Sequence, residues 1–131
     1  MPFDLLAHTA DVRAAVSAPD RPALYQAAVD LVRTLVVGDS PVAARETRLV
    51  PPDGADEAER FFRFVRELLF LVDAEGFVPQ AVTGMEPPAV AGERYDPARH
   101  TSEHQLKALT RHGYEFRQAA AGYRAEMVFD L

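Results

Sequence analysis

The chain has 131 residues, 48% hydrophobic and 26% charged, which fits one globular domain spanning residues 1–131. It contains no cysteine, and this excludes disulfides, thiolate zinc sites and cysteine nucleophiles. The formal net charge of -6 argues against direct nucleic-acid binding, because proteins that bind nucleic acid unaided usually carry a basic patch. No signal peptide and no apolar segment of about 20 residues is visible, so we expect a soluble cytoplasmic protein without a membrane span.

A first helix is predicted between Asp20 and Gly38. Asp20 can cap it, and Pro22 suits its first turn. Residues at helical spacing form its apolar face: Leu24, Ala27, Ala28, Leu31 and Leu35.

A second helix is predicted from Asp56 to about Ala74. Asp56 and Glu59 have the spacing of a capping box, and Gly76 is placed to end the helix. One side is lined by Phe61, Phe64, Val65, Leu68, Leu69 and Val72. Because Phe62, Phe70 and Leu71 add apolar surface on another side, we expect this helix to be buried over most of its girth.

Short extended segments bounded by turn residues account for most of the remaining chain. Strands are predicted at 3–6, 12–17, 45–50, 78–85, 89–90, 105–111, 114–119 and 123–129. This order predicts the α+β class: a two-layer sandwich of two helices packed on a mixed, largely antiparallel sheet of about six strands.

Motifs for nucleotide binding or nucleophilic catalysis are missing from this pattern. No glycine-rich loop follows a strand and opens a helix, and no serine lies in a nucleophile elbow. The sequence therefore favours a protein that is not itself an enzyme.

Oxygen ligands for a hard cation can be sought at the two ends of the chain. Asp130 precedes Leu131, so its side chain would lie close to the terminal carboxylate. Two such anionic groups repel each other unless a cation such as calcium or magnesium lies nearby. Asp11 lies in the polar corner that begins at His8, where an aspartate is most often a turn former.

Three of the four histidines follow one another in the second half: His100, His104 and His112. His100 and His104 are four residues apart, but no glutamate follows the first histidine as zinc hydrolases require. Polar loop histidines are the simpler interpretation. Lys107 alternates with apolar neighbours, as a solvent-facing strand residue does.

Several of these stretches, in the same order, resemble the archease family over nearly the whole chain. The matching stretches are His8-Thr9-Ala10-Asp11-Val12, Leu24 to Ala28, Glu67 to Phe77, Gly92-Glu93, Asp96-Pro97, Arg99-His100, Leu106 to Gly113 and the terminal Asp130-Leu131. Each is weak alone, and their order and spacing together are specific.

The resemblance implies an accessory role for this protein. Archeases assist the GTP-dependent tRNA-splicing RNA ligase that joins 2′,3′-cyclic-phosphate or 3′-phosphate ends to 5′-hydroxyl ends in tRNA splicing and RNA repair. They promote guanylylation of the ligase and multiple turnover. The resemblance also implies a divalent cation, with calcium the first choice, held by Asp11, Asp130 and the carboxylate of Leu131. Lys107, with His8, His100 and His112, is a candidate for the surface that contacts the partner.

Five positions depart from the pattern of the family: Ala7, Phe64, Arg66, Gln105 and Arg111. Two other hypotheses therefore stay open. One is a binding module of the same fold that no longer serves a ligase. The other is a small hydrolase in which a metal at Asp11 activates water and His8 is the nearest general base.

Overall fold

The computed structural model describes residues 11–51 and 53–131. The strand predicted at 3–6, together with Ala7 and His8, lies outside these residues. Within them the chain forms two helices and seven strands.

Both helices begin where their capping residues predict. The first, α1 (Arg21–Val37), follows Asp20, whose side chain accepts a hydrogen bond from the N–H of Ala23 at 2.9 Å. The second, α2 (Glu57–Glu75), follows Asp56, which accepts from the N–H of Glu59 at 2.9 Å. Only half of the predicted capping box is present, because the Glu59 carboxylate binds arginines instead.

The seven strands form two antiparallel sheets instead of the single mixed sheet predicted from the sequence. One sheet has the order β2 (Glu46–Leu49), β4 (Pro88–Arg94), β3 (Phe77–Met85). In the other, β7 (Gly122–Asp130) pairs on one edge with β1 (Asp11–Ala18), and on the other edge with β5 (Ala108–Leu109) and β6 (Glu115–Ala119).

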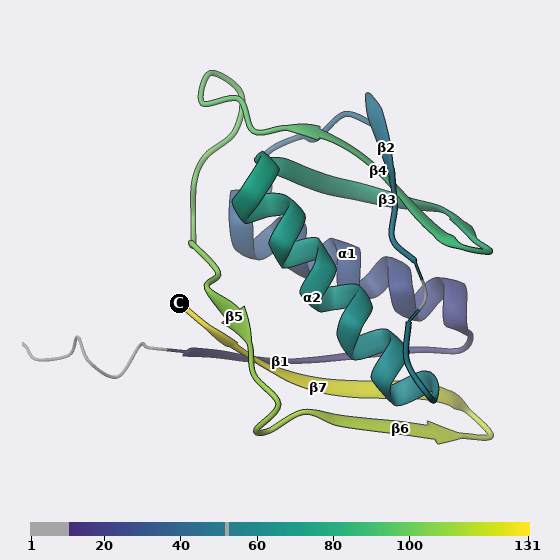
Figure 1. Ribbon diagram of the computed structural model, residues 1–131. Coiled ribbons are helices and arrows are strands. Elements are labelled where there is room, and N and C mark those ends of the chain that lie inside the picture. The colour runs from purple at the N-terminus through teal and green to yellow at the C-terminus, as the bar shows by residue number, and fades with distance from the viewer. Residues whose placement is uncertain (1–10, 52) are drawn as a thin grey trace, which may run out of the picture.

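The helices lie between the two sheets. In Figure 1 the β2-β4-β3 sheet lies above α1 and α2, and the sheet around β7 lies below them. Helix α1 contacts β3 as well as β1 and β7, and α2 contacts β3 as well as β5 and β6. The α+β class with two helices packed on sheets is confirmed, and the strands divide because each sheet covers its own side of the helix pair.

This position between two sheets explains which faces of the helices are buried. The buried face of α1 is rotated from the predicted one, and Leu31 and Leu35 are only half-buried. The fully buried residues of this helix are Leu24, Tyr25, Ala28, Val29, Val32 and Val37. In α2 the predicted apolar residues are buried apart from two: Val72 is partly buried, and Phe70 is 56% exposed.

Close approach of three strands requires glycine at position 92. The residue pairs with Glu46 of β2 and Pro79 of β3. A Cβ atom at this position would lie 2.1 Å from the carbonyl oxygen of Val78. Glycine here allows β4 to pack tightly on β3, and it precedes the buried residue Glu93.

Candidate functional site

Strands β1 and β7 bring Asp11 and Asp130 together. The two residues face each other directly in the antiparallel register, at the end of the paired segment. Side chains that face each other in this way lie on the same side of the sheet, with Cβ atoms about 4.5–5.5 Å apart. Both side chains are exposed. Residues from opposite ends of the sequence thus form one acidic pair, called here the acidic corner.

The short strand β5 brings Lys107 to the same corner. Ala108 pairs with Asp130, and the N–H of Lys107 donates to the carbonyl oxygen of Asp130 at 2.8 Å. Continuing this register would place Lys107 opposite Leu131, whose side chain packs against the core. Four residues singled out in the sequence, Asp11, Asp130, Leu131 and Lys107, therefore meet at one end of this sheet.

The acidic corner suits a hard cation by its chemistry. Among the described residues neither Asp11 nor Asp130 forms an ion pair or a side-chain hydrogen bond. Like charges directly opposite in a sheet repel each other, and a divalent cation with oxygen ligands would relieve this repulsion. No group of three or more histidine, cysteine, aspartate or glutamate residues in the described part of the chain could hold a metal ion. The described residues therefore offer two facing carboxylate side chains at this corner, and not three.

The histidines proposed for the partner surface occupy different environments. His112 is exposed in the turn between β5 and β6, where its carbonyl oxygen accepts from the hydroxyl of Thr110 at 2.6 Å. His8 lies outside the described residues. His100 does not lie on the surface predicted for it, because its side chain is fully buried.

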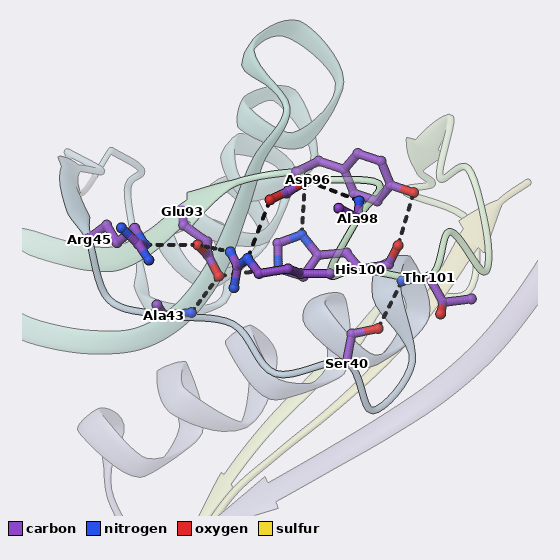
Figure 2. A network of polar contacts seen from close by, with 10 residues as sticks. Ser40, Ala43, Arg45, Glu93, Asp96, Ala98, His100 and Thr101 are labelled. Atoms are coloured by element: carbon purple, nitrogen blue, oxygen red, sulfur yellow. Dashed lines mark hydrogen bonds and ion pairs between the residues drawn. The ribbon is translucent and has the colours of Figure 1, made fainter.

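His100 belongs to a polar network around the buried carboxylate of Glu93. Figure 2 shows this carboxylate between Arg45, Ala43 and His100. It accepts from the N–H of Ala43 at 2.6 Å, pairs with Arg45 Nε at 3.2 Å, and also binds the guanidinium of Arg99. A buried charge is stable only when it is paired and hydrogen-bonded in this way.

The hydrogen bonds of the His100 ring show which of its two nitrogens carries the proton. The N–H of Asp96 donates to Nδ1 at 2.9 Å, so this nitrogen is the acceptor and Nε2 carries the proton of the neutral ring. Nε2 lies 3.2 Å from Oε2 of Glu93 and donates to it. Burial alone would raise the pKa of Glu93, but the hydrogen bonds from Ala43 and His100 and the charge of Arg99 outweigh burial and lower this pKa.

The network anchors the segment 95–107, which connects the two sheets. Further along this segment the N–H of Thr101 donates to Oγ of Ser40 at 2.9 Å (Figure 2), and the N–H groups of Glu103 and His104 donate to carbonyl oxygens of Val36 and Leu35. These are carbonyls at the end of α1, which have no partner inside the helix. The segment ends at Lys107, whose N–H donates to Asp130 of β7. By holding the segment in place, the network helps to position the acidic corner.

Glu93 was not among the candidate residues predicted from the sequence. The signal was present in the pairs Gly92-Glu93 and Arg99-His100 of the family resemblance, but a motif match does not distinguish a residue that supports a segment from one that contacts a partner. The contacts of Arg99 and His100 with the buried Glu93 carboxylate show that these residues support the segment.

Comparison with known proteins decides the family of this chain. Residues 3–131 match the model of the Archease protein family (MTH1598/TM1083). The chain belongs to the archease family. It is 27% identical over 134 residues to protein archease of Pyrococcus abyssi, covering 95% of this chain and 94% of the relative. It is also 27% identical over 140 residues to protein archease of Methanopyrus kandleri, covering 100% of both chains.

Solved structures of the family share the fold. The solution structure of Methanobacterium thermoautotrophicum protein 1598 has a TM-score of 0.76 at 22% identity, covering 98% of this chain and 96% of the other. A crystal structure from Thermotoga maritima, described as an archease and possible chaperone, has a TM-score of 0.67 at 18% identity and covers 100% and 98%. At these identities the likeness establishes the architecture.

Within residues 11–51 and 53–131, neither helix combines the length and the hydropathy that a membrane-spanning helix requires.

Proposed function

We propose that this archease activates a GTP-dependent RNA ligase that joins 3′-phosphate or 2′,3′-cyclic-phosphate ends to 5′-hydroxyl ends. It promotes guanylylation of the ligase and its multiple turnover, in tRNA splicing and RNA repair. The observation that supports this most is the meeting of Asp11, Asp130 and Lys107 at one end of the β1-β7-β5 sheet in a chain of this family.

The acidic corner holds a divalent cation in this proposal. Asp11, Asp130 and the carboxylate of Leu131 supply the oxygen ligands, and calcium is the first choice because it accepts irregular sets of oxygen ligands. The cation supplies positive charge that neutralises negative oxygens of the partner's nucleotide. Lys107 holds the end of β7 through its backbone N–H, and its exposed side chain is available to the partner.

The protein acts through its partner and not as an enzyme or by binding RNA itself. The formal net charge of -6 supports this, because nonspecific binding to a phosphate backbone needs excess positive charge. In this proposal the protein is a cytoplasmic accessory protein that presents a metal ion to its partner. The sequence, which has no motif for nucleophilic catalysis, is consistent with this role.

Guanylylation of the ligase from the same source tests the proposal. The ligase is incubated with GTP under multiple-turnover conditions alone, with the native protein, and with its Asp11→Asn variant. We expect stimulation by the native protein and its loss in the variant, because the substitution removes one charge from the acidic corner. Asp39→Asn is the matched control, since Asp39 is exposed and lies outside the corner.

Three results contradict parts of the proposal. Stimulation that is equal in the Asp11→Asn variant would keep the activator role and move the important contacts elsewhere. Equal loss in the Asp39→Asn variant would show that the corner is not the cause. No stimulation by folded native protein would exclude the activator role and favour a binding module of this fold that serves no ligase.

A further inference from the structure

The outward face of the sheet around β7 carries a charged row next to the acidic corner. Side chains alternate between the two faces of a strand, so Arg13 lies on the same outward face as Asp11, about 7 Å further along β1. Across the sheet Arg13 faces Val128, which lies two residues from Asp130. Arg13 is therefore the basic residue nearest to the acid pair on this face.

Arg13 differs from the other two arginines on this face. Arg117 forms an ion pair with Glu115 at 2.9 Å, and Arg124 lies 3.5 Å from Glu126. Arg13 is exposed and forms no ion pair within the part of the chain that the structure describes. Its charge is thus available to an external anion.

A shallow hollow of about 240 Å³ lies beside Arg13 on this face. Ala15, Gly113 and Val128 contribute small or apolar groups to its lining, and the ion pair of Arg124 with Glu126 lines it as well. Glycine at 113 matters for this shape, because a Cβ atom there would lie 2.8 Å from a methyl group of Val128. The hollow leaves room for a small group beside the guanidinium of Arg13, which lines it.

We infer that Arg13 binds a phosphoryl group of a ligand that is held at the cation in the acidic corner. A phosphate monoester carries a charge of about -1.5 to -2 and three terminal oxygens, so it can offer one oxygen to the cation and two to the guanidinium. A carboxylate has only two oxygens and cannot do both with the same geometry. This inference rests on the proposed function, in which the corner faces the partner's nucleotide.

Binding of the cation and of the phosphate is then cooperative. Without the anion, the positive charge of Arg13 repels a cation in the acidic corner, because Arg13 lies only two residues from Asp11 on the same face of β1. With the phosphate bound between them, its negative oxygens neutralise the charges of both the cation and the Arg13 guanidinium. Because linkage is reciprocal, a phosphate monoester that requires Arg13 must tighten cation binding by the same factor as the cation tightens phosphate binding.

Calorimetric titration of the full-length protein with calcium, with and without phenyl phosphate, tests this coupling. Blank titrations correct for calcium binding by phenyl phosphate itself. In the native protein we expect phenyl phosphate to lower the Kd for calcium by about fivefold or more. In Arg13→Ala, calcium still binds without phosphate, at least as tightly as in the native protein, and the enhancement by phosphate is lost.

Two further variants sharpen the result. Arg13→Lys retains the charge but not the paired donors, so part of the enhancement should remain. Arg117→Ala removes an arginine from the same face further from the corner and should leave the enhancement intact. Circular dichroism checks that each variant is folded, which we expect because both arginines are exposed.

The outcomes separate the inference from the proposed function. Calcium binding without any enhancement, or an enhancement that persists in Arg13→Ala, overturns the role of Arg13 and leaves the cation site standing. Failure of the native protein to bind calcium at all overturns the cation site, and the role of Arg13 falls with it.

Discussion

A single buried residue, Glu93, connects the two sheets more firmly than its place in the sequence indicates. Its carboxylate accepts from Ala43, which precedes β2, and from His100, in the segment that leads to β5. Removal of this carboxylate leaves buried donors without partners, and each such donor costs about 1–3 kcal/mol.

Glu93→Ala should therefore lower the free energy of unfolding by about 1–3 kcal/mol or more. Chemical denaturation measures this change. Glu103→Ala, in the same connecting segment but exposed, is the control and should have little effect. If both variants were equally stable, the network would not support the segment.

A second residue, Glu59, makes the stability of the folded protein depend on pH. Hydrogen bonds from Arg111 and Arg63 lower its pKa from 4.5 to about 2. Because the pKa in the folded protein is depressed, the contribution of Glu59 is fully present above pH 4.5 and is lost as the pH falls from 4.5 toward 2.

Glu59→Gln should lower the melting temperature at neutral pH and reduce its fall between pH 4.5 and 2. Thermal unfolding followed across this pH range checks the prediction. Glu67→Gln removes a carboxylate from the same helix that forms no ion pair among the described residues, and it should preserve the native pH profile. An unchanged profile in Glu59→Gln would contradict the role of its ion pairs.

At the residue scale the sequence indicated the candidate site only in part. Chemistry suggested that an acidic group near the C-terminus needs a cation, and the family resemblance added Asp11. The direct pairing of Asp11 with Asp130 depends on strand register, which sequence alone did not fix. The burial of His100 depends on Glu93, seven positions earlier, and exposure of a loop histidine was the simpler expectation.

At the scale of elements, helix α1 protects the free edge of β3. Gln26 donates from Nε2 to the carbonyl oxygen of Gln80 at 3.2 Å and accepts from the N–H of Val82 at 2.8 Å. Its amide thus replaces a neighbouring strand at this edge. Arg33 donates to the same carbonyl oxygen at 2.9 Å. Unpaired strand edges invite pairing with other chains, so these contacts also protect the protein from aggregation.

Gln26→Ala should reduce stability by about 1 kcal/mol and increase aggregation on heating, because it leaves the edge groups of β3 without their partners. Denaturation and light scattering measure the two effects. Gln118→Ala, on the exposed strand β6, is the matched control and should change neither. Equal aggregation of the two variants would contradict a protective role of Gln26.

The predicted strand 105–111 shows why the predicted boundaries of some elements differ from the observed ones. Only Ala108–Leu109 forms strand β5. Glu103 and His104, which precede the predicted strand, donate backbone hydrogen bonds to the end of α1, and the chain reaches β7 only at Lys107. The helix caps, by contrast, were predicted correctly because a cap depends on residues three positions apart, as at Asp20 and Asp56.

At the scale of the whole molecule, the two helices and their apolar residues define the core that both sheets share. The class of the fold could be predicted because periodicity reveals the elements. The division into two sheets could not, because it depends on which strands pair across the chain. The rotated buried face of α1 has the same origin, since a helix between two sheets buries residues on more than one side.

Phe129→Ala should lower the free energy of unfolding by about 3–5 kcal/mol, because this ring is fully buried on β7. Phe70→Ala provides a matched control on α2, where the ring is 56% exposed, and should change stability by no more than about 0.5 kcal/mol. Urea denaturation of both variants measures the difference. Comparable losses would show that the core is arranged differently.

The pairing of β1 with β7 also bears on how the protein folds. These strands come from opposite ends of the described chain, whereas β3 and β4 are joined by a tight turn. Contacts between distant segments carry a large entropic cost of loop closure and form slowly. We therefore expect the β3–β4 hairpin to form early and the β1–β7 ladder late, so that the face that presents Asp11 and Asp130 assembles only after the core that supports it.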